Sequence, residues 1–108
     1  MGWELMVFVL AGGAVSAGCL LPAGWLPVLP HDKLLHFVAF AGLTVLAAQV
    51  APAWPQLLPW LVGLLLAGWL IELLQKFVPG RSFCWRDLAA NAAGIAAAAT
   101  GILLVRAF

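Results

Sequence analysis

The side chains in this sequence that could do chemistry are gathered in four short stretches. They are Asp32, Lys33 and His36; Glu72, Gln75 and Lys76; Arg81 and Arg86; and Asp87 and Asn91. Histidine titrates near neutral pH and a carboxylate can give or accept a proton, so these residue types suit acid–base chemistry. Lysine and arginine suit the binding of phosphate and carboxylate groups.

Spacing places these side chains on common helix faces. In three of the stretches a polar residue is followed by another four positions later, as Asp32 is by His36. Residues three or four apart share one face of a helix. His36, Glu72 and Asn91 each lie about four residues inside an apolar run, which is about 6 Å along a helix that rises 1.5 Å per residue. We therefore expect three helices to present polar groups at one depth.

The elements that carry these side chains follow from composition. Of the 108 residues, 66% are hydrophobic and only 8% are charged, whereas a soluble domain carries about 25% charged residues. A small soluble domain has a large surface that must be polar, and a disordered chain is polar and charged. Both classes are therefore excluded, and the net charge of +1 gives no nucleic-acid footprint. The composition predicts an integral membrane protein.

Four apolar runs, at about residues 3–21, 34–50, 57–74 and 88–105, approach the roughly 20 residues that a spanning helix needs. Prolines mark the breaks between them, at Pro22, Pro27 and Pro30, at Pro52, Pro55 and Pro59, and at Pro79 before Gly80. Because backbone groups in lipid must be satisfied within their own segment, the runs should be helices. We predict an all-α, multi-pass, four-helix transmembrane bundle, with residues 1–108 forming one domain and no extramembrane domain.

The chain reverses direction with each span, so its charges gather at one membrane face. The second span starts, the third ends and the fourth starts at that face, whereas the opposite face has Glu4, Arg106 and the termini. A charged group at mid-bilayer costs about 2.5–3.5 kcal/mol, so these groups should face one another. We predict a shallow polar cavity between the second, third and fourth spans. Gly94, Ala98 and Gly101 lie on one side of the fourth span and would allow close helix packing.

The two cysteines, Cys19 and Cys84, are both expected near the polar face. A disulfide between them is geometrically conceivable, but we favour two unpaired, packed thiols. Neither cysteine belongs to a zinc-type spacing.

Four motifs occur in a characteristic order. They are Asp32-Lys33-Leu34-Leu35-His36-Phe37 with Phe40, Glu72-Leu73-Leu74-Gln75, Pro79-Gly80-Arg81-Ser82, and Asp87-Leu88-Ala89-Ala90-Asn91 with Gly94. Over essentially residues 5–105 this set resembles the VanZ-like family of small bacterial membrane proteins, named for a protein linked to resistance to teicoplanin, a lipid-tailed glycopeptide antibiotic. The resemblance implies a multi-pass protein of the bacterial cytoplasmic membrane. Relatives often carry an acidic residue before the aspartate of the fourth span, where this chain has Phe83-Cys84-Trp85-Arg86, which weakens the case for a carboxylate-rich metal site.

Three hypotheses for the site remain open, and binding is the favoured one. The cavity would bind an anionic envelope-lipid headgroup or a lipid-tailed compound through Asp32, Lys33, Gln75, Lys76, Arg81 and Asn91. Membrane lipids are then the expected partners and nucleic acid is not, while the oligomeric state stays open.

The second hypothesis is an enzyme acting on an envelope lipid, with His36 and Glu72 exchanging protons. Asp87 would orient His36, and Asn91 would stabilise a developing oxyanion. A metal held by His36, Glu72 and Asp87 is a minor form of this hypothesis, and we predict no metal site and no cofactor.

The third hypothesis is structural. The polar residues would pair as Glu72–Arg81, Asp87–Lys76 and His36–Asn91 to lock the bundle. The protein would then bind a larger partner through its lipid-facing sides.

Two arguments about orientation conflict. Lys33, Lys76, Arg81 and Arg86 outnumber Arg106, so the positive-inside rule places the polar face in the cytoplasm and both termini outside. A role against an antibiotic that acts outside the cell favours the opposite orientation.

Overall fold

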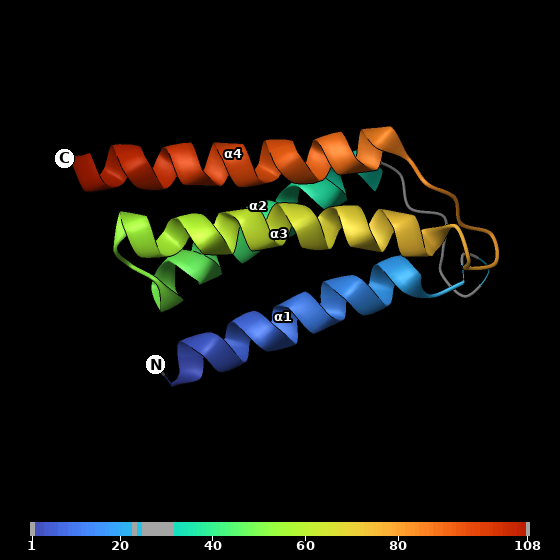
Figure 1. The fold of residues 1–108 in the computed structure, drawn as a ribbon, viewed down its shortest axis with the longest axis horizontal. Helices are drawn as coiled ribbons and strands as arrows, with labels where there is room; N and C mark the ends of the chain where they lie inside the picture. Colours follow the sequence, from blue (N-terminus) through green and yellow to red (C-terminus); the bar gives the residue numbers. More distant parts are fainter. Residues whose placement is uncertain (1, 23, 25–31, 108) are drawn as a thin grey trace.

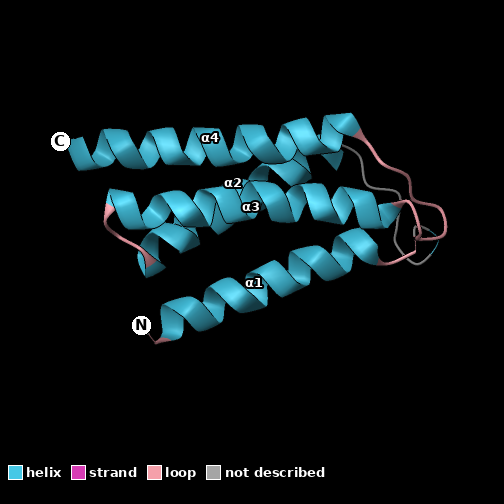
Figure 2. Cartoon of the chain, in the orientation of Figure 1, coloured by secondary structure: helices cyan, strands magenta, loops and turns pink. Residues whose placement is uncertain are grey.

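The protein is an all-helical bundle, as predicted. The computed structural model describes residues 2–22, 24 and 32–107, and these residues form four helices and no strand (Figures 1 and 2). The helices are α1 (Trp3–Leu20), α2 (Asp32–Val50), α3 (Trp54–Gln75) and α4 (Trp85–Ala107).

All four helices are long and apolar enough to cross a membrane. α3, with 22 residues, is about 33 Å long at 1.5 Å per residue, and the hydrocarbon core of a bilayer is about 30 Å thick. Large apolar side chains such as Val38, Leu66 and Leu70 are more than half exposed. A continuous apolar surface of this kind is unstable in water and suited to lipid. The chain is therefore a small multi-pass membrane protein.

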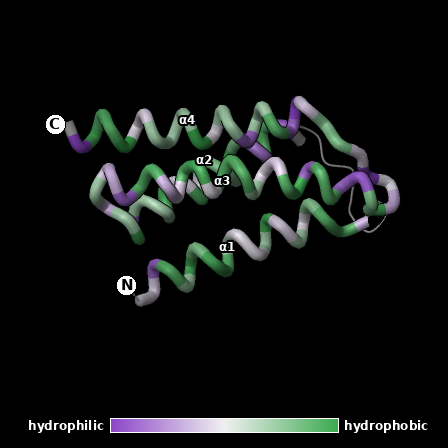
Figure 3. Tube along the Cα trace, viewed as in Figure 1, coloured by the Kyte–Doolittle hydropathy of each residue, from purple (hydrophilic) through white to green (hydrophobic). Residues whose placement is uncertain are grey.

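The helices run alternately up and down. α1 and α3 end, and α2 and α4 begin, at one end of the bundle, which we call the polar end, while the start of α1 and the end of α4 lie at the opposite end (Figure 1). Figure 3 shows hydrophilic residues concentrated at the polar end and around the loop that joins α3 to α4. The predicted gathering of charge at one face is confirmed in this arrangement.

The third helix begins earlier than expected, at Trp54 instead of residue 57, and it includes two prolines that we had assigned to the break between spans. Pro55 lies in the first turn, where a backbone N–H has no helical partner and proline costs little. Pro59 lies inside the helix and removes one backbone donor. That position is near the end of the span, where water can satisfy the carbonyl left without a donor.

α2 and α4 form the most extensive contact in the bundle, whereas α1 contacts only α2 and α3. None of the residues of α1 is buried. The core is centred on α2, with Phe40, Leu43 and Ala47 buried against Leu57 of α3 and Ile95 of α4. The first helix is therefore the least tightly held part of the bundle.

The contact between α2 and α4 depends on Gly94. A Cβ atom at this position would lie 2.3 Å from the Phe37 carbonyl oxygen and 3.1 Å from the Ala41 nitrogen, so the two backbones meet directly. A Cβ at Gly101, by contrast, would meet no atom within 4 Å. Close approach through small residues is thus observed at Gly94 and does not extend to Gly101.

We expect the substitution Gly94→Ala to lower the free energy of unfolding by about 1–3 kcal/mol, because the added methyl group overpacks a backbone contact. The measurement is unfolding of the purified protein in dodecylmaltoside with increasing SDS, followed by tryptophan fluorescence. Gly101→Ala is the matched control and should leave the midpoint unchanged. Equal midpoints for the two variants would contradict the close approach of α2 and α4.

Candidate functional site

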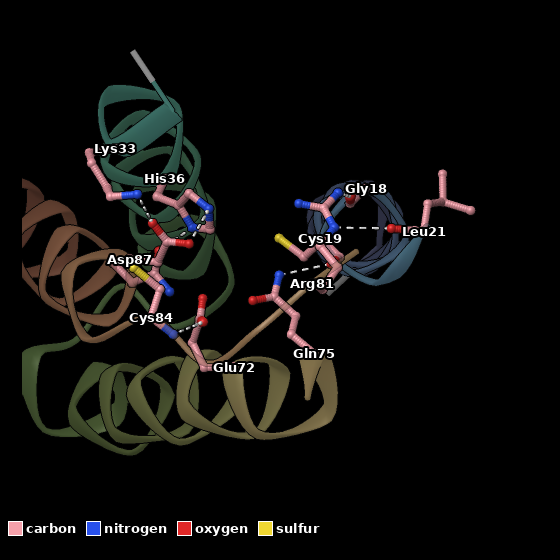
Figure 4. Close-up of polar contacts among 11 residues, drawn as sticks. Gly18, Cys19, Leu21, Lys33, His36, Glu72, Gln75, Arg81, Cys84 and Asp87 are labelled. Carbon is pink, nitrogen blue, oxygen red and sulfur yellow. Dashed lines mark hydrogen bonds and ion pairs between the residues drawn. The ribbon is translucent and has the colours of Figure 1, made fainter. Parts of the chain in front are cut away.

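Three helices bring buried polar side chains together at the polar end. His36 comes from α2, Glu72 from α3 and Asp87 from α4 (Figure 4). Asn91 also comes from α4. Glu72 is fully buried, Asn91 is 2% exposed and Asp87 is 7% exposed. The four residues, called the polar cluster below, lie near their helix ends, so the up-and-down order of the helices brings them to one depth.

His36 connects the two residues of α4. Its Nδ1 lies 2.9 Å from Asn91 Oδ1, and because an amide oxygen only accepts, Nδ1 donates this hydrogen bond. Its Nε2 lies 3.5 Å from Asp87 Oδ2. The predicted pairing of His36 with Asn91 and the orienting contact from Asp87 are therefore both present. The bond to Asn91 fixes the ring so that Nε2 faces the Asp87 carboxylate.

Asp87 also pairs with a lysine. Its Oδ1 lies 2.6 Å from Lys33 Nζ, and the Lys33 side chain is 46% exposed, so the ammonium reaches the carboxylate from the surface. The expected pair between Asp87 and Lys76 is wrong. Lys76 instead places its Nζ 5.5 Å from the centre of the Phe83 ring, and a cation over an aromatic face is an attractive contact.

Glu72 is held by the backbone instead of by a cation. Its Oε2 accepts a hydrogen bond of 3.2 Å from the backbone N–H of Cys84. Its Oε1 is buried and has no hydrogen-bond partner. A buried acceptor without a partner costs about 1–3 kcal/mol, and more when the group is charged. The expected pair between Glu72 and Arg81 is wrong, because Arg81 is turned toward a different helix.

Arg81 and Gln75 hold the end of α1. Arg81 donates from Nε to the Leu21 carbonyl at 3.1 Å and from Nη2 to the Gly18 carbonyl at 3.2 Å, while Gln75 Nε2 donates to the Cys19 carbonyl at 2.8 Å. Carbonyl groups at the end of a helix have no intrahelical donor, so these side chains supply one. Gly80, with φ of 77°, provides the left-handed turn just before Arg81.

The structure thus divides the residues that the sequence singled out. His36, Glu72, Asp87 and Asn91 come together, with Lys33 at their edge. Gln75 and Arg81 face α1, and Lys76 is exposed at the surface. The side chain of Asp32 lies outside the described residues. No disulfide joins Cys19 to Cys84, as favoured.

A groove that the sequence did not indicate lies between α1, α2 and α3. Its volume is about 450 Å³, and the residues that line it are Phe8, Gly12, Val15, Ser16, Phe40, Leu43, Pro59, Trp60, Gly63, Leu64, Ala67 and Ile71. Nearly all are apolar, so only the arrangement of the helices reveals the groove. Ile71 precedes Glu72, and Phe40 lies one turn from His36. The groove therefore ends about 5 Å, one helical turn, from the polar cluster.

The polar cluster also has the composition of a metal-binding group. His36, Glu72 and Asp87 each offer one nitrogen or oxygen atom within 4.8 Å of those offered by the other two. Imidazole and carboxylate are both common ligands of divalent transition metals.

The fold is that of a small multi-pass membrane protein, with a cluster of polar side chains near one end of its helices. A model of the VanZ/LLP1 family matches residues 5–107, nearly the whole chain, and the protein therefore belongs to this family. The resemblance inferred from the ordered motifs is confirmed. No curated protein and no solved structure matches the chain at a significant level.

The contacts of Arg81 predict that it controls the docking of α1. Arg81→Met keeps most of the side-chain length but removes the donors to Gly18 and Leu21. Hydrogen bonds from a charged group contribute about 1.5–3 kcal/mol, so maleimide labelling of Cys19, in protein that also carries Cys84→Ser, should become roughly 10-fold faster.

Arg86→Met is the matched control for this prediction, because Arg86 is exposed at the same end of the bundle. Its labelling rate should equal that of the Cys84→Ser parent. An unchanged rate in Arg81→Met would show that α1 is held without the Arg81 hydrogen bonds.

Proposed function

We propose that this protein binds an anionic molecule with a lipid tail, with the polar head at the polar end of the bundle and the tail in the groove. The observation that carries the proposal is the position of the apolar groove, which ends one helical turn from the polar cluster. A membrane ligand with a charged head joined to an acyl chain matches this arrangement, because its head would lie near the polar cluster and its chain in the apolar groove.

The groove has the dimensions of a site for one acyl chain. It extends along α3 from Pro59 to Ile71, which is about 18 Å at 1.5 Å per residue. This length is a little more than half of the roughly 30 Å hydrocarbon core, the depth that the chains of one leaflet occupy. Its volume lies within the range of about 300–1,000 Å³ that is typical of ligand pockets.

Exposed cations at the polar end would contact the head. Lys33, Lys76 and Arg86 are exposed there, at the start of α2, the end of α3 and the start of α4. Arg81, which we expected to bind phosphate, is engaged with carbonyl groups of α1. The contribution of Arg81 to ligand binding is then to hold one wall of the groove.

Membership of the VanZ/LLP1 family supports a place for this ligand in the bacterial cell envelope. The site would lie in the cytoplasmic membrane, and the ligand would be an anionic envelope lipid or a lipid-tailed antibiotic such as teicoplanin. In both cases the shared chemistry is an acyl chain joined to a polar, anionic head.

Binding is favoured over acid–base catalysis by the contacts of His36. Nδ1 donates to Asn91 and Nε2 faces Asp87, so both ring nitrogens are directed at protein groups. Asn91 accepts from the ring through its amide oxygen, which orients the side chain. These contacts support a role in fixed geometry over proton exchange with a lipid.

Filling the groove should weaken binding of the tail. Added Cβ atoms at Gly12 and Gly63 would meet nothing within 4 Å, so Gly12→Leu and Gly63→Leu should fold normally and occupy the groove. Each methylene that loses its buried position costs about 0.8 kcal/mol. We expect dioleoyl-phosphatidylglycerol to bind at least about 10-fold more weakly, as measured by native mass spectrometry of the protein in detergent.

Gly13→Leu is the matched control, because Gly13 is exposed on the same helix and does not line the groove. A dihexanoyl lipid with the same head should be affected much less by Gly12→Leu than the dioleoyl lipid. Teicoplanin, tested in a second arm, identifies which lipid-tailed ligand binds. The proposal is wrong if phosphatidylglycerol and phosphatidylcholine bind equally, or if both groove variants bind as the parent does.

A further inference from the structure

We infer that His36, Glu72 and Asp87 form a binding site for one divalent transition-metal ion, for which zinc is the best fit. This deepens the proposed function, because the ion would lie at the head-binding end of the same site. Its existence does not require that a lipid binds. The donors are one imidazole nitrogen and two carboxylate oxygens, contributed by three different helices.

The distances are those of a site that needs little adjustment. Zinc is bound by histidine nitrogen at about 2.0–2.1 Å and by carboxylate oxygen at about 2.0–2.2 Å, in a tetrahedral arrangement that separates two ligand atoms by about 3.4 Å. His36 Nε2 and Asp87 Oδ2 are 3.5 Å apart. The atom offered by Glu72 lies within 4.8 Å of the atoms offered by the other two residues, so a shift of at most about 1.4 Å would complete the triangle.

The hydrogen bonds in the cluster leave a lone pair on His36 Nε2 directed at an oxygen of Asp87 when the ring is neutral. Because His36 Nδ1 donates its hydrogen to Asn91, the Nε2 atom of a neutral ring is an acceptor. It faces an oxygen of Asp87, which is also an acceptor. A proton or a metal ion between these two atoms would make the contact attractive, and a metal ion would also reach Glu72.

The buried carboxylate of Glu72 supports a cation site independently of the contacts of His36. It is fully buried, and its Oε1 has no hydrogen-bond partner. Figure 4 shows its carboxylate pointing toward His36 and Asp87, while the other oxygen is held by Cys84. A buried carboxylate oxygen that points toward two further metal-ligand atoms is suited to binding a cation.

Each of the three residues is also held by an outer contact through another atom. Asn91 accepts from the His36 ring, Lys33 pairs with Asp87 Oδ1, and the Cys84 N–H donates to Glu72 Oε2. Metal ligands are commonly oriented in this way, and the outer contact fixes the histidine tautomer. Three protein ligands leave a fourth position open, where an anionic oxygen of a lipid head could bind.

The negative charge of the two carboxylates also supports the binding of a divalent cation. Glu72 and Asp87 bring two buried carboxylates, and, among the described residues, Lys33 is a cation that contacts Asp87, with about half of its side chain in solvent. A divalent cation would balance the charge of these two carboxylates. The same site could then attract an anionic head that its carboxylates alone would repel.

From the sequence we predicted no metal, partly because Phe83-Cys84-Trp85-Arg86 lacks the acidic residue common among relatives. The structure shows what this segment contributes in this chain, which is the backbone N–H of Cys84 on Glu72. The donor set is completed without a carboxylate from the segment.

The direct test measures zinc bound to the full-length protein. The protein is purified in dodecylmaltoside through a tag without histidine, stripped with EDTA and dialysed against buffered Zn²⁺. Bound metal is then counted by inductively coupled plasma mass spectrometry. We expect one zinc ion per chain, and Co²⁺ in its place should give visible absorption bands of a four-coordinate site.

Glu72→Gln, Asp87→Asn and His36→Gln should each weaken zinc binding at least 100-fold, and Asn91→Ala about 10–100-fold, as for loss of an outer contact. Glu4→Gln is the matched control, because it removes a carboxylate from the opposite end of the bundle. Glu72→Gln keeps the size of the side chain and removes a buried charge, so it should fold. Zinc should raise the melting temperature of the parent and of Glu4→Gln, and leave that of Glu72→Gln unchanged.

The inference is overturned if the parent binds no more zinc than Glu72→Gln, in which case a proton on His36 stabilises the cluster. It is also overturned if binding survives all three ligand substitutions. Phosphatidylglycerol binding, measured with and without EDTA, separates the two proposals. Lipid binding without zinc binding rejects the metal site alone, and zinc binding without lipid binding rejects the proposed function alone.

Discussion

The direct contact of two backbones, those of α2 and α4 at Gly94, is the constraint on which the rest of the site depends. With hydrogen alone at this position, the helices approach closely enough for His36, next to Phe37, to reach Asn91, one turn before Gly94. The same approach brings Asp87 to the other side of the imidazole ring. α3 then adds Glu72 to an arrangement that α2 and α4 have already fixed.

Much of the fold, and the set of residues that meet at the polar end, could be predicted from the sequence because a membrane permits few kinds of structure. Runs of this length and apolarity can only be spanning helices, and alternating direction assigns every polar stretch to an end of the bundle. Helical spacing then assigns His36, Glu72 and Asn91 to one depth. The all-α bundle follows from the length and apolarity of the runs. The convergence of these residues follows from the alternating direction of the spans and from helical spacing, without knowledge of any contact.

The pair of His36 with Asn91 was predicted correctly, but the partners of Glu72 and Asp87 were not, because several cations lie at similar sequence distances from each carboxylate. Arg81 lies on a loop, and the turn at Gly80 directs it to α1 rather than to Glu72. Backbone groups compete for the same side chains, as the Cys84 N–H and the carbonyls of α1 show, and they have no signature in the sequence. The groove was not visible for a related reason, since lipid-facing and groove-facing apolar residues are alike in type.

The bond between Glu72 and residue 84 has a consequence for how this protein can vary. Because the donor is a main-chain N–H, nineteen of the twenty amino acids supply it equally well, and only proline lacks it. Position 84 can therefore drift between small, aromatic and charged side chains while its role is retained. A residue can be indispensable to a site through its backbone and still show no preference in its identity.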